Sequence, residues 1–212
     1  MKAQGLYPIV DVDSLAKRGL GVVAFAERVL EARPSLLQLR AKSMGARETL
    51  ALLRRLKPLC ESVGTLLFAN DRPDLAVIAG AAGVHVGQDD LPLAEVRRFA
   101  PGLLVGVSTH NRTQFEAALA ERPDYVALGP IFETSSKANP EPVVGLAELA
   151  HAAERARAVN VPLVAIGGID RERASLVAST GALASLIGAL LPEGSALDEV
   201  SARAKALQAL WT

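Results

Sequence analysis

Short aliphatic runs alternate with longer amphipathic segments along almost the whole chain, and this rhythm restricts the fold more than any other feature. Each short run has the length of a buried strand, and each longer segment has the periodicity of a helix with one apolar face. Repeated strand–helix alternation is typical of parallel βαβ units, because parallel strands need long crossover connections. The predicted strands are residues 6–10, 36–40, 66–69, 83–87, 103–107, 125–129, 162–166 and 183–187.

Eight strand–helix pairs in 212 residues predict a single (β/α)8 TIM barrel of class α/β that occupies residues 1–212 as one domain. The predicted helices are residues 19–32, 47–63, 73–79, 92–99, 111–121, 146–157, 171–179 and 197–210. The main alternative, an open doubly wound sheet, usually places a glycine-rich phosphate turn after its first strand. Here Asp11, Val12 and Asp13 follow that strand and form no such turn.

Composition sets the type of core and excludes some partners. Half of the residues are hydrophobic but only 4% are aromatic, so we expect an aliphatic core. Lys plus Arg equals Asp plus Glu, so no net charge attracts the chain to nucleic acid or a membrane. The lone Cys60 is interpreted as a small buried hydrophobe. Without an apolar run of about 18 residues or an export signal, we expect a cytoplasmic protein.

Polar residues cluster at the end of the second predicted strand. In a barrel, functional groups sit at the C-terminal ends of the strands. Three polar residues alternate with leucines here: Gln38, Arg40 and Lys42 alternate with Leu37 and Leu39. Because side chains of a strand alternate between its two faces, we expect the polar side chains to face the barrel interior. Two cations and an amide at a barrel mouth suit a phosphate or diphosphate. The alternative is a solvated strand end with salt bridges to neighbouring loops.

Carboxylates follow the next two predicted strands. Asn70 and Asp71 end the third strand, and Asp90 follows the fourth. Two carboxylates on adjacent strand ends indicate a site for a hard cation such as Mg²⁺, which leaves its other positions to water and phosphate. The alternative is helix capping, because Pro73 and Pro92 each follow two residues later.

Later strand ends add further candidates. Ser108, after the fifth strand, is able to bind a phosphate oxygen, and His110 is an acid–base candidate or a capping residue. The long loop after the sixth strand carries Thr134, Ser136 and Lys137, which are suited to phosphate, although a plain surface loop is the alternative.

Glycines follow the last two strands, where phosphate commonly binds in such barrels. Gly168 follows the seventh strand, and Ile187 and Gly188 follow the eighth. His85, within an aliphatic strand, is interpreted as a core histidine whose hydrogen bonds are satisfied inside the protein.

Taken together, these segments resemble the thiamine phosphate synthase family over nearly the whole chain. The matching motifs are Q-L-R-A-K at 38–42, F-A-N-D at 68–71, G-V-H-V-G-Q-D-D-L at 83–91, G-V-S-T-H at 106–110, A-L-G-P-I-F at 127–132, T-S-S-K at 134–137 and A-I-G-G-I at 165–169. The resemblance implies a Mg²⁺-dependent transferase that joins a pyrimidine diphosphate to a thiazole phosphate. Its partners would be these small molecules, with no nucleic acid or membrane.

The resemblance also implies a role for each matching residue. The pyrimidine diphosphate would be bound by Gln38, Arg40, Lys42, Asn70, Ser108 and Lys137, of which Arg40, Lys42, Ser108 and Lys137 would be catalytic. The thiazole phosphate would be bound by Thr134, Ser136, Gly168, Ile187 and Gly188, and Mg²⁺ by Asp71 and Asp90. The chain departs from the family pattern at Asp89, Glu133, Ser136 and Gly188, where Glu, Pro, Thr and Ser are usual.

Two other functions remain as alternatives. A thiazole tautomerase of the same barrel family would need no metal and would use His110 as its acid–base group, but it leaves Asp71, Asp90 and Lys137 unexplained. A non-catalytic protein that binds a phosphate ligand would keep the pocket without the chemistry.

Overall fold

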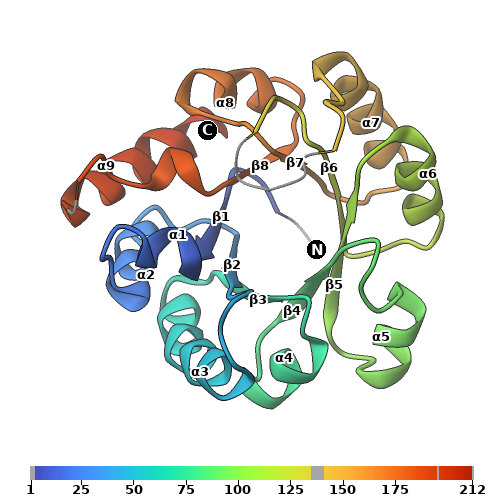
Figure 1. Ribbon diagram of the computed structural model, residues 1–212. Helices are drawn as coiled ribbons and strands as arrows, with labels where there is room; N and C mark the ends of the chain where they lie inside the picture. Colours follow the sequence, from blue (N-terminus) through green and yellow to red (C-terminus); the bar gives the residue numbers. More distant parts are fainter. Residues whose placement is uncertain (1–2, 135–140, 195, 212) are drawn as a thin grey trace.

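Eight parallel strands close into a barrel in chain order, and helices surround it (Figure 1). This is a computed structural model, which describes residues 3–134, 141–194 and 196–211. The first strand pairs with both the second and the eighth, which closes the ring. The predicted (β/α)8 barrel is therefore confirmed, and all eight strands end at the same mouth.

The elements agree with the predicted ones to within a few residues. The strands are β1 (Leu6–Asp11), β2 (Leu36–Arg40), β3 (Leu66–Asn70), β4 (Gly83–Val86), β5 (Leu104–Thr109), β6 (Tyr125–Leu128), β7 (Leu163–Ile166) and β8 (Leu183–Leu186). The helices are α1 (Val12–Ala16), α2 (Val22–Leu30), α3 (Ala46–Val63), α4 (Pro73–Ala79), α5 (Leu93–Phe99), α6 (Arg112–Ala120), α7 (Leu146–Ala158), α8 (Arg171–Ala178) and α9 (Leu197–Gln208), with 3-10 turns at Gly188–Leu190 and Ala209–Trp211.

The short helix α1 is absent from the sequence-based prediction. It begins because the carboxylate of Asp11, the last residue of β1, accepts a hydrogen bond from the backbone N–H of Ser14 at 2.9 Å. A helix of five residues is too short to show a period in the sequence, so its residues looked like the exit from a strand.

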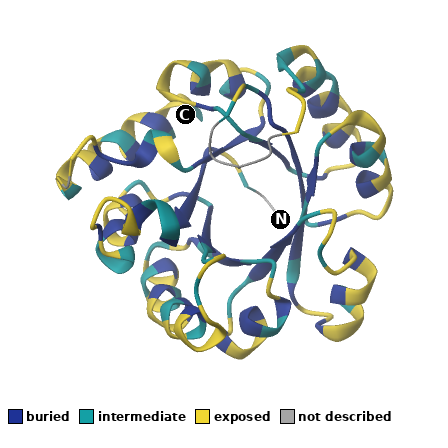
Figure 2. Cartoon of the chain, viewed as in Figure 1, coloured by how far each residue is buried: buried dark blue, intermediate teal, exposed yellow. Residues whose placement is uncertain are grey.

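Most of the core lies between the strands and the helices and is aliphatic. Figure 2 shows strands that are buried along their length and helices that are buried on the inner side and exposed on the outer side. Helix α3, for example, buries Leu53, Leu56 and Cys60 on one stripe. Burial raises the pKa of the Cys60 thiol to about 12, which fits the expected inert core cysteine. None of the helices in the described part of the chain has the length and hydropathy needed to cross a membrane.

The barrel interior, by contrast, contains three aromatic rings among aliphatic side chains such as Leu36, Val164 and Leu183, so the expected aliphatic core describes it only in part. Tyr7, Phe68 and Tyr125 pack edge to face, and the centroids of Phe68 and Tyr125 lie 5.4 Å apart. Glycines on neighbouring strands make room for these rings. A Cβ on Gly106 would lie 1.9 Å from the Tyr125 ring, and one on Gly83 would lie 2.3 Å from Phe68.

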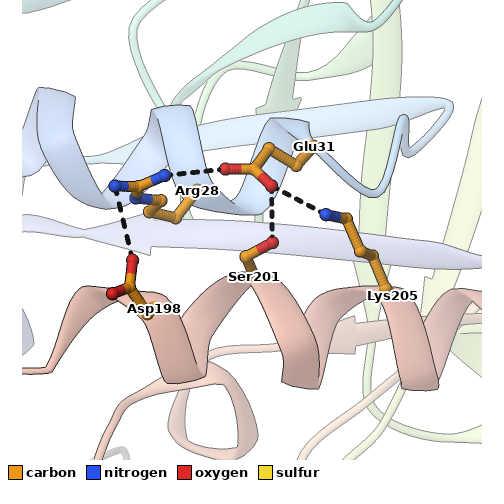
Figure 3. A network of polar contacts seen from close by, with 5 residues as sticks. All are labelled: Arg28, Glu31, Asp198, Ser201 and Lys205. Atoms are coloured by element: carbon orange, nitrogen blue, oxygen red, sulfur yellow. Dashed lines mark hydrogen bonds and ion pairs between the residues drawn. The ribbon is translucent and has the colours of Figure 1, made fainter.

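A polar network joins helices α2 and α9, which come from opposite ends of the chain (Figure 3). Glu31 accepts hydrogen bonds from Lys205 Nζ and Ser201 Oγ, both at 2.7 Å. Arg28 bridges Glu31 at 3.0 Å and Asp198 at 3.4 Å. The hydrogen bonds from Lys205, Ser201 and Arg28 lower the pKa of Glu31 to about 2. The network stabilises the barrel next to the seam between β1 and β8.

The lowered pKa of Glu31 predicts a pH-dependent contribution to stability. A carboxyl group with a lowered pKa in the folded state stabilises the protein above its unfolded pKa, and this contribution disappears as pH falls through the folded pKa. We expect Glu31→Gln to lower the melting temperature by about 1–3 °C at pH 7, because these groups are solvent-exposed. The difference should shrink as pH falls from 4.5 to about 2.

Calorimetry of the two proteins across this pH range measures the effect. The control is Glu27→Gln, which changes an exposed glutamate on the same helix. A difference between Glu31→Gln and the unchanged protein that is equally large at pH 2 and pH 7 would contradict the assignment.

Candidate active site

A cavity of about 410 Å³ opens at the mouth formed by the C-terminal ends of the strands. This volume lies within the range of small-molecule sites. Eleven of the candidate residues line it, namely Gln38, Arg40, Lys42, Asn70, Asp71, Asp90, Ser108, Thr134, Gly168, Ile187 and Gly188. The other two candidates, Ser136 and Lys137, lie outside the described residues. The strand ends thus bring together residues that are far apart in the sequence.

The floor of the cavity is a chain of buried hydrogen bonds across the barrel. Gln38 Nε2 donates to the Tyr7 hydroxyl at 2.9 Å, the hydroxyls of Tyr7 and Tyr125 lie 2.8 Å apart, and His85 Nδ1 lies 2.7 Å from the Tyr125 hydroxyl. Burial raises the pKa of both tyrosines, so they stay neutral. His85 has the internal hydrogen bond expected of a core histidine, but it also lines the cavity.

The two cations at the end of β2 form ion pairs with carboxylates of neighbouring strand ends. Arg40 Nη1 lies 2.5 Å from Asp11 Oδ2, and Lys42 Nζ lies 3.2 Å from Asp71 Oδ2. Leu39, between them, lies in the core between strands and helices, as the strand period predicted. The salt bridges weighed as an alternative do form, but they form at the cavity and not on an outer surface.

The partner of Arg40 is ionised and nearly inaccessible to solvent. Burial alone would raise the pKa of Asp11, but the hydrogen bonds from Ser14 and Arg40 outweigh burial and lower the pKa below its usual value. Asp11 therefore presents a fixed negative charge that orients the Arg40 guanidinium beside the cavity.

Backbone geometry places the carboxylates of Asp71 and Asp90 at the cavity. Asp71 adopts a left-handed backbone with φ of 61°, and its N–H donates to the carbonyl of His85 at 2.8 Å. Asp90 Oδ2 accepts from the N–H of Gly87 at 2.7 Å. Strain at a non-glycine residue is typical of functional sites, where the surrounding structure holds the chain in place.

Neither carboxylate caps a helix, so the capping interpretation is wrong for both. The residue at the N-terminus of α4 is Arg72, and that of α5 is Pro92; neither makes a side-chain cap. Pro73 and Pro92 do lie at the starts of α4 and α5. Asp71 and Asp90, two residues before them, line the cavity instead.

The negative charges of Asp71 and Asp90 repel each other. Burial, followed by the charge and the hydrogen-bonding contact of Asp71, raises the pKa of Asp90, while the Gly87 N–H and Lys42 act in the other direction. A cation between the two carboxylates would relieve this repulsion. Among the described residues, no three or more His, Cys, Asp or Glu side chains gather as a metal site. Two carboxylates that leave room for substrate oxygens and water nevertheless fit Mg²⁺.

Ser108 lies near the end of β5 and His110 directly after it, on the next part of the rim. Ser108 is buried, and its carbonyl accepts a hydrogen bond from Gln88 Nε2 at 2.6 Å. His110 Nδ1 lies 2.7 Å from the carbonyl of Gly129, so this nitrogen carries the proton and fixes the ring. His110 is not a cap, because the side chain of Asn111 caps helix α6.

The rim beyond β7 and β8 exposes backbone. Gly168 has a φ of 66°, and a Cβ there would lie 2.3 Å from the carbonyl oxygen of Glu133, so no other residue fits. A Cβ on Gly188, by contrast, would meet no atom of the described residues within 4 Å. The departure from the usual Ser at Gly188 thus leaves open space rather than a filled contact.

Several residues of the site were not predicted. Asp11 is a carboxylate at the end of a strand, which is the pattern that identified Asp71 and Asp90 as candidates. The same pattern could therefore have identified Asp11 from the sequence. Tyr7 and Tyr125 lie in apolar strands, where a buried hydroxyl needs a partner. Nothing in the sequence pointed to the cavity-lining side chain of Arg173. Ser185 also lines the cavity, and its buried hydroxyl has no hydrogen-bond partner among the described residues.

The buried pair of Asp11 and Arg40 predicts a loss of stability on mutation. Asp11→Ala should lower the free energy of unfolding by about 2–3 kcal/mol, because it removes the cap of α1 and leaves Arg40 without its partner. Asp11→Asn keeps an oxygen for Ser14 and should lose less. Urea denaturation measures both. Asp13→Ala, at the same turn but more exposed, is the control, and equal losses for Asp11→Ala and Asp13→Ala would disprove the special role of Asp11.

Comparisons with known proteins agree on one family. The profile of the family described as thiamine monophosphate synthase matches residues 6–188. A thiamine-phosphate synthase of Koribacter versatilis is 46% identical over 189 residues, which is 86% of each chain. That of Anaeromyxobacter dehalogenans is 43% identical over 91% of this chain and 84% of its own. A solved structure of thiamine phosphate pyrophosphorylase from Pyrococcus furiosus superposes with a TM-score of 0.83 at 28% identity, covering 98% of this chain and 95% of the other. The chain therefore belongs to the thiamine monophosphate synthase family.

Proposed function

We propose that this chain, a transferase of thiamine biosynthesis, transfers the 4-amino-2-methylpyrimidin-5-ylmethyl group from its diphosphate to 4-methyl-5-(2-phosphooxyethyl)thiazole. The products are thiamine phosphate and diphosphate. One observation carries the proposal: Arg40 and Lys42 lie at the same cavity as the carboxylates of Asp71 and Asp90. Cations beside a carboxylate pair form a site for a diphosphate and a divalent metal ion.

The diphosphate would bind beside β2 and β3. Arg40 offers a planar fork that Asp11 already orients, and Lys42 offers a point charge. Asn70 at the end of β3 adds a polar amide, and Ser108 near the end of β5 adds a hydroxyl. Lys137, which lies outside the described residues, would supply a further charge. Mg²⁺ held by Asp71 and Asp90 would neutralise oxygens of the diphosphate and so improve it as a leaving group.

The reaction needs no nucleophile from the protein. The methylene C–O bond breaks, its electron pair leaves with the diphosphate, and the thiazole nitrogen forms the new C–N bond. The amino-pyrimidine ring delocalises positive charge at the methylene carbon, so a dissociative path is favoured. The protein then acts by holding both rings in line and by stabilising negative charge on the diphosphate. Gln38, fixed by Tyr7, would present its amide oxygen to the pyrimidine amino group.

The thiazole phosphate would bind on the opposite part of the rim. The backbone around Gly168, Ile187 and Gly188 faces the cavity there, and Thr134 adds a hydroxyl. Ser136, outside the described residues, would add another. This arrangement leaves the thiazole ring between its own phosphate and the pyrimidine methylene.

A thiazole tautomerase is the second candidate, because His110 lines the cavity with one ring nitrogen fixed by Gly129. That reaction has no diphosphate and so leaves the Asp71–Asp90 pair without a task. A non-catalytic binding protein would keep the same cavity but would show no turnover.

An assay of product formation separates the proposed synthase from the other two functions. The purified protein is mixed with both substrates and Mg²⁺, and thiamine phosphate is oxidised and read as thiochrome fluorescence, with EDTA as control. We expect product that depends on Mg²⁺. A folded protein that binds the thiazole phosphate without forming product would contradict the proposal and favour one of the other two functions.

Substitution of the carboxylates tests the metal site. We expect Asp90→Asn to lower kcat/KM by about 100-fold or more and to raise the Mg²⁺ concentration needed for half-maximal rate, because it removes one of two ligand charges. The matched control is Asp89→Asn, since Asp89 is exposed and does not line the cavity. Equal rates and equal Mg²⁺ dependence for the two variants would place the metal elsewhere.

A further inference from the structure

The cations around the cavity are unequally distributed. Among the described residues, three Arg or Lys side chains line it: Arg40, Lys42 and Arg173. The first two lie at the end of β2 and just after it, where each forms an ion pair with a carboxylate. Arg173 lies in the first turn of α8, which follows β7, and lines the cavity beside Gly168. Two phosphate-bearing substrates would meet in this cavity, and Arg173 is the described cation on the second side.

Three contacts hold the Arg173 guanidinium in place. Its Nη1 donates to the carbonyl of Gly168 at 2.8 Å, and its Cζ lies 4.9 Å from the centroid of the Phe132 ring. Its Nε lies 3.5 Å from Asp170 Oδ2. Within the described residues, no hydrogen bond or ion pair uses Nη2. The group is therefore oriented beside Gly168 with donor capacity left over, which reduces the entropy lost on binding an anion.

The surrounding charges show why a cation matters there. Glu133, Glu141 and Asp170 also line the cavity, and their carboxylates would repel a phosphate. Backbone N–H groups at the glycines attract an anion but carry no full charge. An arginine fixed among them supplies the positive charge that a phosphate needs at this rim.

We propose that Arg173 binds the phosphate of the thiazole substrate and makes the enzyme prefer the phosphorylated thiazole over the free thiazole alcohol. This inference rests on the proposed function. Arg173 is thus a specificity-determining residue: it touches the non-reacting end of one substrate and has no part in the departure of the diphosphate. Its removal should raise the KM for one substrate only.

The test compares Arg173→Gln with Arg171→Gln in steady-state kinetics. Arg171 is an exposed arginine on the same helix and does not line the cavity, so it is a matched control. We expect Arg173→Gln to raise the KM for the thiazole phosphate about tenfold, the effect of one charge-assisted hydrogen bond. The KM for the pyrimidine diphosphate, the kcat at saturation and the rate with the free thiazole alcohol should change less than about twofold. Arg173→Lys should restore part of the loss, because it keeps the charge without the fork.

Each failure has its own meaning. If the unchanged protein forms no thiamine phosphate, the proposed function is wrong. If it is active but Arg173→Gln leaves the KM for the thiazole phosphate unchanged, the inference about Arg173 alone is wrong. Equal increases in both KM values, or an equal loss with the free alcohol, would show a general distortion of the rim and would likewise overturn it. Melting temperatures of both variants should stay within about 2 °C of the unchanged protein, because both side chains are partly or fully exposed.

Discussion

The hydrogen bond between the hydroxyls of Tyr7 and Tyr125 lies between the packed interior of the barrel and the cavity at its mouth. Below it, the rings of these tyrosines and Phe68 pack among aliphatic side chains and against glycines on neighbouring strands. Above it, Gln38 and His85 continue the chain of hydrogen bonds and form the polar floor of the cavity. Buried polar groups that hydrogen-bond one another are rigid, because breaking one of these hydrogen bonds would leave a polar group unpaired in a medium of low dielectric constant. The polar residues of the cavity rim therefore lie above a rigid, hydrogen-bonded floor.

The charged side chains around the cavity lie on two sides of its rim. On the side of β2 to β4, Arg40 and Lys42 form ion pairs with Asp11 and Asp71, and Asp90 lies close to Asp71. Under the proposed function, a diphosphate with its metal ion would take over the partners of these pairs, which would avoid the full cost of burying a lone charge. On the side of β7 and β8, open backbone faces the cavity beside Arg173. Under the proposed function, the same mouth would bind two anions at separate places, and their reactive ends would meet between them.

The sequence was sufficient for the order of the elements and for the residues at strand ends, because both follow from local periodicity and from the geometry of parallel strands. It was insufficient for features that depend on how distant segments meet. Helix α1 is too short for a period, and the aromatic filling of the barrel depends on Gly83 and Gly106, which lie far from the rings in sequence. Capping was a reasonable interpretation of Asp71 and Asp90 from their prolines, but backbone bonds to His85 and from Gly87 turn both carboxylates to the cavity. Arg173 reaches the rim only through the fold of the loop after β7.

The most direct test of this account is the position of a divalent metal ion in a crystal grown with Mn²⁺ and diphosphate, located by anomalous scattering. The account predicts a peak between the carboxylates of Asp71 and Asp90, with the diphosphate on its far side within hydrogen-bonding distance of Arg40 and Lys42. A peak elsewhere, or a diphosphate bound away from β2 with the Lys42–Asp71 ion pair intact and no metal ion beside it, would contradict the account.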